Sequence, residues 1–172
     1  MPDILPIVEH LKHTAAGLRA MAEACAPERW RDAPRPGAWS AAEVIAHLTM
    51  VEDSTLAGAD KALRHGPRKV TLWQRLHPPV SIVQRRLPRV KSPLPLDLNL
   101  LGGKLEMLNG YAARRVRSLA LVAETKDRDL SKHYWRHPFF GMLDFYEWFW
   151  LIGHHEIRHT KQIREIVGSF QK

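Results

Sequence analysis

The chain has 172 residues, of which 45% are hydrophobic, and a formal net charge of +8 at neutral pH. A chain of this length can bury a substantial core, so we expect residues 1–172 to form a single domain. No apolar run is long enough to cross a bilayer and no signal-peptide pattern opens the sequence, so neither a membrane partner nor secretion is expected. The lone cysteine, Cys25, cannot form an internal disulfide, which favours a cytoplasmic location.

The first part of the chain predicts two long helices. Apolar residues recur near the 3.6-residue period over residues 3–25, and Pro27 ends this pattern. Ser40-Ala41-Ala42-Glu43 is a capping box, in which the serine oxygen accepts from the backbone amide of the glutamate and the glutamate accepts from that of the serine. It begins a second helix over residues 40–63, and the Gly66-Pro67 pair terminates that helix.

The connection over residues 68–98 is predicted to be a long crossover, which prolines interrupt and which has room for short helices at 71–76 and 81–87. It overlaps a stretch without Asp or Glu that carries nine basic residues: Lys61, Arg64, Arg68, Lys69, Arg75, Arg85, Arg86, Arg89 and Lys91. A positive charge of this size can attract anions. The stretch is therefore interpreted as a nucleic-acid-binding surface, as the rim of a pocket for an acidic substrate, or as a solvated face without a ligand. Because no nucleic-acid-binding motif accompanies it, nucleic acid is not the favoured partner.

Two further long helices are predicted after this connection. The third spans residues 100–126, residues 128–142 are predicted to form a loop, and a second capping box, Asp144-Phe145-Tyr146-Glu147, begins a fourth helix that extends to residue 167. No strand-like alternation is evident. These elements predict an all-α fold, a four-helix bundle with a long crossover between the second and third helices.

Three histidines form the main candidate site. His155 and His159 are four residues apart in the fourth helix, so their imidazoles share one helical face. His47 lies two turns into the second helix, and side chains on facing helices are how bundles build metal sites. Three imidazoles suit a divalent Zn, Ni or Fe ion and leave a coordination position open for water or substrate. The alternative is a histidine pair that packs in the core or on the surface without a metal.

The segment His155-Glu156-Ile157-Arg158-His159 also matches the H-E-x-x-H pattern of zinc peptidases, in which Glu156 would be the general base. No histidine follows His159 to act as a third ligand, so a peptidase is not favoured. Glu156 is therefore a secondary catalytic candidate, with a surface ion pair to an arginine as the alternative. Gln162, one turn beyond His159, is a second such candidate that could contact a bound ligand or pack against the helix.

The sequence resembles the DinB-like superfamily in three segments. These are Gly37-Ala38-Trp39-Ser40 leading to His47-Leu48, the loop His137-Pro138-Phe139-Phe140-Gly141, and Glu147-Trp148 followed by His155 through Gln162-Ile163. The resemblance implies a four-helix bundle that holds a divalent ion on His47, His155 and His159. Activities in that superfamily include thiol-dependent S-transfer, maleylpyruvate isomerisation and metal-dependent hydrolysis.

Together, the residues and the resemblance lead us to expect a metal-dependent enzyme in which the ion activates a thiol or water, of thiol S-transferase or hydrolase type. The substrate would be a small molecule, and the basic stretch favours an anionic cosubstrate such as a low-molecular-weight thiol. The alternative is a non-catalytic helical module that binds metal, a partner or nucleic acid. A homodimer also stays open, because bundles with aromatic-rich faces often dimerise.

Overall fold

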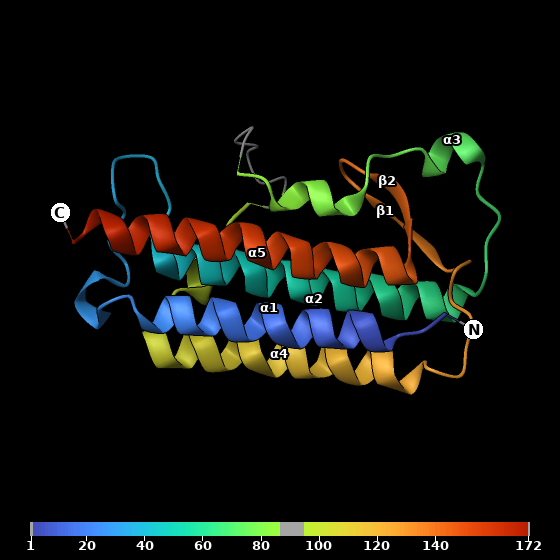
Figure 1. Ribbon diagram of the computed structural model, residues 1–172, viewed down its shortest axis with the longest axis horizontal. Helices are drawn as coiled ribbons and strands as arrows, with labels where there is room; N and C mark the ends of the chain where they lie inside the picture. Colours follow the sequence, from blue (N-terminus) through green and yellow to red (C-terminus); the bar gives the residue numbers. More distant parts are fainter. Residues whose placement is uncertain (1, 87–94, 172) are drawn as a thin grey trace.

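A computed structural model describes residues 2–86 and 95–171 of the chain. Its four long helices lie side by side as a bundle, in which α1 and α2 each pack against both α4 and α5 (Figure 1). Their bounds are Leu5–Glu23 for α1, Ala41–His65 for α2, Lys104–Glu124 for α4 and Phe145–Ser169 for α5. The predicted helical segments are confirmed to within a few residues at each end. Their apolar faces meet between the helices, where Leu18, Ile45, Phe145, Phe149 and Ile163 are buried.

Both predicted capping boxes are present. Ser40 Oγ accepts from the backbone amide of Glu43 at 3.2 Å, and the Glu43 carboxylate accepts from the Ser40 amide at 2.7 Å. Asp144 and Glu147 exchange the equivalent pair of bonds at the start of α5, at 3.0 and 2.9 Å. These boxes satisfy amides that the helices leave unpaired, and they fix the residue at which α2 and α5 begin.

A β-hairpin corrects the all-α prediction. Strands β1 (Tyr134–His137) and β2 (Gly141–Asp144) pair antiparallel within a segment that was predicted to be partly loop. Strands of four residues are too short to show an alternating pattern, so the sequence carries little signal for them. The hairpin packs on α5, where the Trp135 and Trp148 rings stack with centroids 5.0 Å apart. Gly141 has a φ of 73°, which a glycine adopts without strain.

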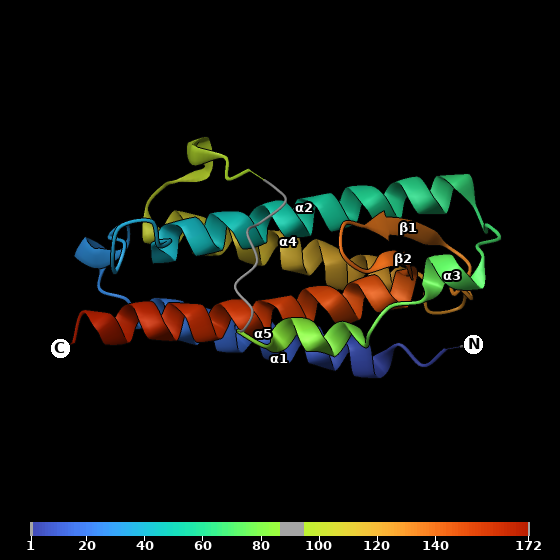
Figure 2. The same cartoon turned by 90° about the horizontal axis from the view of Figure 1, so that it is seen from above.

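The connection between α2 and α4 is long, as predicted, and part of it lies along the outer side of α5 (Figure 2). Within it, α3 (Leu72–Arg75) and a 3-10 turn (Val80–Gln84) occupy the places of the two predicted short helices. This course brings Arg85 and Arg86 beside α5, whereas Leu87, Arg89 and Lys91 lie outside the described residues. A second short 3-10 turn, Leu98–Leu100, precedes α4.

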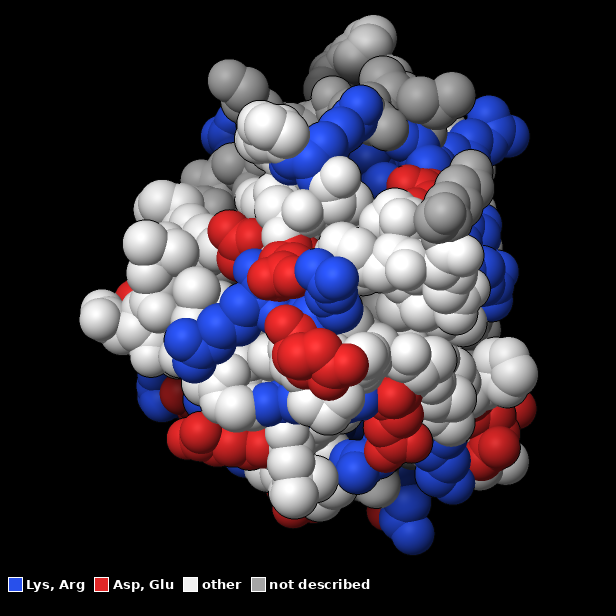
Figure 3. Space-filling model, turned by 90° about the vertical axis from the view of Figure 1, so that its left-hand side faces the viewer, with Lys and Arg blue, Asp and Glu red and all other residues white. Residues whose placement is uncertain are grey.

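Charges of both signs cover the end of the bundle where α5 terminates. Basic and acidic side chains are intermingled over the middle and lower part of this face, whereas basic side chains gather toward its upper edge (Figure 3). None of the described helices combines the length and the apolar character that crossing a membrane requires.

Substituting alanine for either of two helical glycines is expected to have opposite effects on stability. A methyl group at Gly58 in α2 would lie 2.5 Å from the Trp135 indole nitrogen, whereas nothing lies within 4 Å of one at Gly17 in α1. We expect Gly58→Ala to lower the free energy of unfolding by roughly 1–3 kcal/mol, because the hairpin must shift. Gly17→Ala should raise it by about 0.5–1 kcal/mol through helix propensity. Urea unfolding measures both, and a stabilising Gly58→Ala would contradict the close packing of Trp135 on α2.

Candidate metal centre

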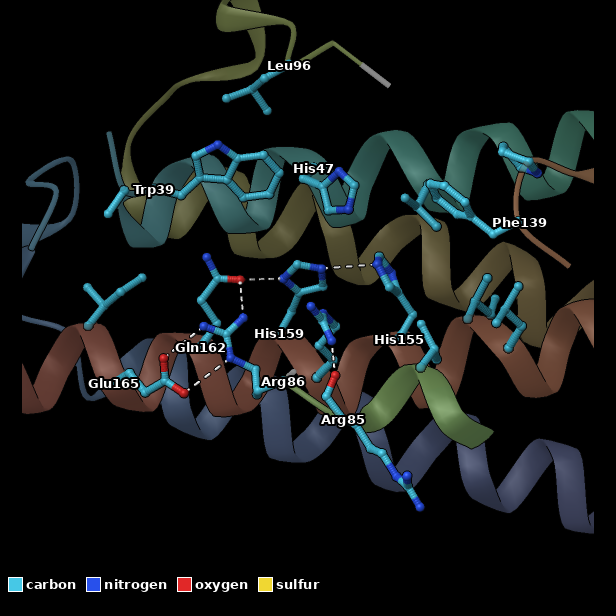
Figure 4. A pocket seen from close by; sticks show the side chains of 18 of the residues that line it. Trp39, His47, Arg85, Arg86, Leu96, Phe139, His155, His159, Gln162 and Glu165 are labelled. Atoms are coloured by element: carbon cyan, nitrogen blue, oxygen red, sulfur yellow. Dashed lines mark hydrogen bonds and ion pairs between the residues drawn. The ribbon is translucent and has the colours of Figure 1, made fainter. Parts of the chain in front are cut away.

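The structure brings His47, His155 and His159 together between α2 and α5 (Figure 4). One ring nitrogen from each histidine lies within 4.8 Å of the others. His47 and His159 are only 5% and 6% exposed, and His155 is half-buried. The capping boxes begin their helices at fixed residues, and packing of α2 against α5 then places His47 opposite the His155–His159 pair.

The spacing of the three rings suits a single ion. The Nε2 atoms of His155 and His159 are 3.1 Å apart, and the His47 ring centroid lies 5.2 and 5.0 Å from those of His155 and His159. Two nitrogens that ligate one ion at about 2.1 Å lie roughly 3–3.5 Å from each other. Lone pairs that converge in this way repel unless a proton or a cation lies between them, so the donor set fits a divalent metal.

Burial keeps these imidazoles in the neutral form that binds metals. It lowers the pKa of His47 to about 4. Burial, together with smaller effects of neighbouring His47 and Arg158, lowers the pKa of His155 to about 3. Burial, with His155 and His47 beside it, also lowers the pKa of His159 well below its usual value. At neutral pH all three therefore offer a free lone pair without first losing a proton.

A groove of about 1250 Å³ extends along α5 from Trp148 to Ser169 and has the three histidines in its wall. Residues of α2, the hairpin turn and the α2–α4 connection form its other sides. The end near the hairpin is lined by aromatic rings, those of Phe139, Phe140 and Trp148. A small molecule could therefore reach a position beside the triad.

A family model described as the DinB superfamily matches residues 10–163, a range that contains all three histidines. The chain belongs to the DinB superfamily. It is 28% identical over 147 residues to the uncharacterized protein YuaE of Bacillus subtilis (strain 168). The alignment covers 84% of this chain and 87% of that protein. The crystal structure of TT2238, a four-helix bundle protein, matches with a TM-score of 0.53 and 24% identity over 93% of this chain and 97% of that one. That likeness shows the fold of this DinB-superfamily chain.

Gln162 lies beside the triad, in contact with one of its members. Its side-chain oxygen Oε1 is 2.9 Å from His159 Nδ1 and also accepts a bond of 3.2 Å from Arg86 Nη1. The close approach of Gln162 follows from its position one turn beyond His159. Arg86, by contrast, comes from the connection 76 residues earlier, and no local pattern in the sequence associates it with the site.

Two other groove residues were not singled out from the sequence. The Trp39 ring packs against the rings of His47 and His159, with centroids 5.1 and 6.3 Å away. His137 Nδ1 accepts the backbone amides of Phe139 and Phe140 at 3.1 and 3.2 Å, so the neutral ring carries its proton on Nε2. Burial lowers the pKa of His137 to about 4 and keeps it in this form at neutral pH. The sequence signal that could have placed Trp39 and His137 in the site was their presence in two of the segments that resemble the superfamily, Trp39-Ser40 and His137-Pro138.

Glu156 lies in the bundle core and does not line the groove. Glu156 does pair with an arginine, but the expected surface location is wrong, because the side chain is completely buried. Its carboxylate accepts bonds from the hydroxyls of Thr14 and Tyr111 and from the guanidinium of buried Arg115. Arg115 Nη2 also lies 3.3 Å from the Glu52 carboxylate, so α2, α4 and α5 share one buried charge cluster. The position of Glu156 argues against a role as a general base for chemistry at the triad.

Proposed function

We propose that this DinB-superfamily protein is a divalent-metal-dependent enzyme whose ion, Zn, Ni or Fe, is held by His47, His155 and His159. The observation that carries this proposal is the convergence of three neutral imidazoles in the wall of a groove large enough for a small molecule. When bound, a divalent ion there would supply Lewis-acid activation of a thiol or a water molecule. Family membership supports the same general chemistry but does not select the reaction.

Thiol S-transfer is the most concrete form of this proposal. The Arg158 guanidinium lies on the groove wall near the triad, where its positive charge would attract the anionic groups of a low-molecular-weight thiol. The aromatic rings at the hairpin end provide a surface for the apolar part of an electrophilic acceptor. Hydrolysis, with water in place of the thiol, uses the same open position beside the histidines.

A non-catalytic metal-binding module is the alternative, and such a module would not need a groove beside its ligands. The groove is therefore the feature that favours an enzyme.

The proposal is tested by the metal content of protein purified without an affinity tag. We expect near-stoichiometric Zn, Ni or Fe in the wild type and its loss in His47→Ala and His155→Ala, because each variant removes one of three ligands. His13→Ala, which changes an exposed histidine of α1, is the matched control and should retain the metal. Thiol consumption with an electrophilic acceptor should follow the metal content. A wild-type protein that neither contains nor takes up a metal would leave the binding module as the better account.

A further inference from the structure

We propose that Arg86 acts through Gln162 to fix the tautomer of His159, so that both are positioning residues for this candidate metal ligand. The inference rests on the proposed metal function for its biological purpose. Its physical content, the position of one proton on the His159 ring, can be measured in metal-free protein.

The contacts form a chain from the α2–α4 connection to the triad (Figure 4). Arg86 Nε and Nη2 bind the two oxygens of the Glu165 carboxylate at 3.2 and 2.8 Å. This two-point contact fixes the plane of the guanidinium and directs its third nitrogen, Nη1, to Gln162 Oε1 at 3.2 Å. The same Oε1 atom lies 2.9 Å from His159 Nδ1.

The donor and acceptor roles of Arg86, Gln162 and His159 permit one arrangement of protons along these hydrogen bonds. A guanidinium can donate hydrogen bonds but cannot accept them, so the Gln162 amide must turn its oxygen, and not its NH₂ group, toward Arg86. The oxygen then accepts from His159, which requires the proton of the neutral imidazole to be on Nδ1. The lone pair of His159 is thereby placed on Nε2, the nitrogen that faces His155.

Without Arg86 the amide is free to rotate by half a turn, which would present its NH₂ group to His159 Nδ1. That contact favours the tautomer with its proton on Nε2, which has no lone pair to offer the metal there. His155 has no comparable support, because its Nδ1 is buried without a hydrogen-bond partner among the described residues. Among these two histidines, Arg86 and Gln162 therefore fix the tautomer of His159.

Through these hydrogen bonds, the α2–α4 connection controls the tautomer of a histidine in a site that is built from α2 and α5. Gln84, at the end of the 3-10 turn, is also held on α5, with its amide nitrogen 2.8 Å from His154 Nδ1 and its carbonyl accepting from Lys161 at 3.3 Å. The connection is thus held on α5 at the residue that directly precedes Arg85 and Arg86. Whatever seats this segment on α5 also fixes the acceptor for His159, and by linkage a metal on His159 should favour the seated connection.

The tautomer can be read directly from the imidazole nitrogen chemical shifts of metal-free protein labelled with ¹⁵N-histidine, with His159→Gln used to assign the signals. In the wild type we expect His159 to carry its proton on Nδ1. Arg86→Ala and Gln162→Leu should produce a mixture of tautomers or the Nε2–H form. Gln162→Glu should keep the wild-type form, because a carboxylate can only accept from both neighbours.

Arg85→Ala is the matched control. It removes the same charge from the adjacent residue, whose side chain points away from the triad (Figure 4). Its carbonyl, which accepts from the Arg158 guanidinium, remains in the variant. An Arg86→Ala protein with an unchanged His159 tautomer would overturn the inference, as would an equal change in Arg85→Ala.

Metal affinity, measured by competition with a chelator, is the second readout. Arg86→Ala and Gln162→Leu should each weaken binding by about 10- to 100-fold, the usual effect of removing a hydrogen-bond partner from a ligand. Gln162→Glu should bind at least as tightly as the wild type. The double variant should bind no more weakly than Gln162→Leu alone, because the two residues act in one chain, whereas additive losses would contradict it. Absence of metal binding in the wild type and in every variant, with the tautomer changes as expected, would refute the proposed function and leave the positioning role supported.

Discussion

Replacing Arg115 with methionine is expected to lower the free energy of unfolding by about 3–5 kcal/mol at neutral pH. The Arg115 side chain is 4% exposed and lies between the carboxylates of Glu52 and Glu156, whose side chains are 2% and 0% exposed. Removing the guanidinium leaves two buried carboxyl groups without their cation. A buried charge that has lost its partner costs far more than an exposed one, because the protein interior solvates it poorly.

The loss should also depend on pH. Burial raises the pKa of both Glu52 and Glu156, although Arg115 opposes this shift. In the variant that opposition is gone, so these carboxyl groups take up protons at a higher pH in the folded than in the unfolded chain. A carboxyl group with a raised pKa costs stability as the pH rises. The destabilisation should therefore be smaller at pH 5 than at pH 7.

Arg114→Ala is a matched control for this experiment. Arg114 is the preceding residue and binds Asp53 at 2.8 Å, but both side chains of that pair are partly exposed to solvent. An ion pair in water contributes about 0–1 kcal/mol, so its loss should be small. Urea unfolding of the two variants provides the comparison. If Arg115→Met were no more destabilising than Arg114→Ala, the buried cluster would not contribute as the structure indicates.

This cluster also bears on the orientation of the candidate site. Glu156 is held in the core by groups from α1 and α4, through Thr14, Tyr111 and Arg115. His155 and His159 flank it on the same helix, so the bonds to Glu156 restrict how far α5 can rotate about its axis. At about 100° per residue, His155 lies about 100° and His159 about 60° to the same side of Glu156 around the helix, so a carboxylate held toward the core directs both imidazoles to one side of α5, where the groove lies.

The parts of the fold that could be predicted are those with local signals. The two capping boxes fix where α2 and α5 begin, and the spacing of His155 and His159 places both on one face whatever the tertiary structure. Assigning His47 to the same site needed the further assumption that α2 faces α5, which the four-helix pattern made reasonable.

The features that were missed depend on contacts between distant parts of the chain. The hairpin consists of two four-residue strands, held by Trp135 against α2 and α5. Arg86 reaches Gln162 and Glu165 from a connection whose course follows from tertiary packing. Glu156 was predicted on the surface because a charged residue is normally found there, and only the positions of Thr14, Tyr111 and Arg115 make its burial possible.

A divalent metal should remain bound at a lower pH than histidine ligands normally allow. Ordinary imidazoles have a pKa of about 6.5, so at pH 5 a site with three of them must displace three protons, which weakens binding by about 10⁴-fold relative to pH 7. Here the pKa of His47 is lowered to about 4 and that of His155 to about 3, and that of His159 is also well below its usual value. We therefore expect the affinity to change by less than about tenfold between pH 7 and pH 5.

The same shifts make the metal-free protein less stable in acid. The unfolded chain takes up protons on these histidines near pH 6.5, whereas the folded chain resists them until about pH 4 or below, so stability falls as the pH drops through this window. Chelator competition at pH 7 and pH 5 therefore needs circular dichroism at both values to establish that the metal-free chain remains folded. A loss of affinity of three orders of magnitude in a folded protein would mean that solvent reaches the imidazoles. Retention of affinity would mean that the burial seen for His47 and His159 keeps the ligands ready to bind, since the bundle then excludes the proton that competes with the metal.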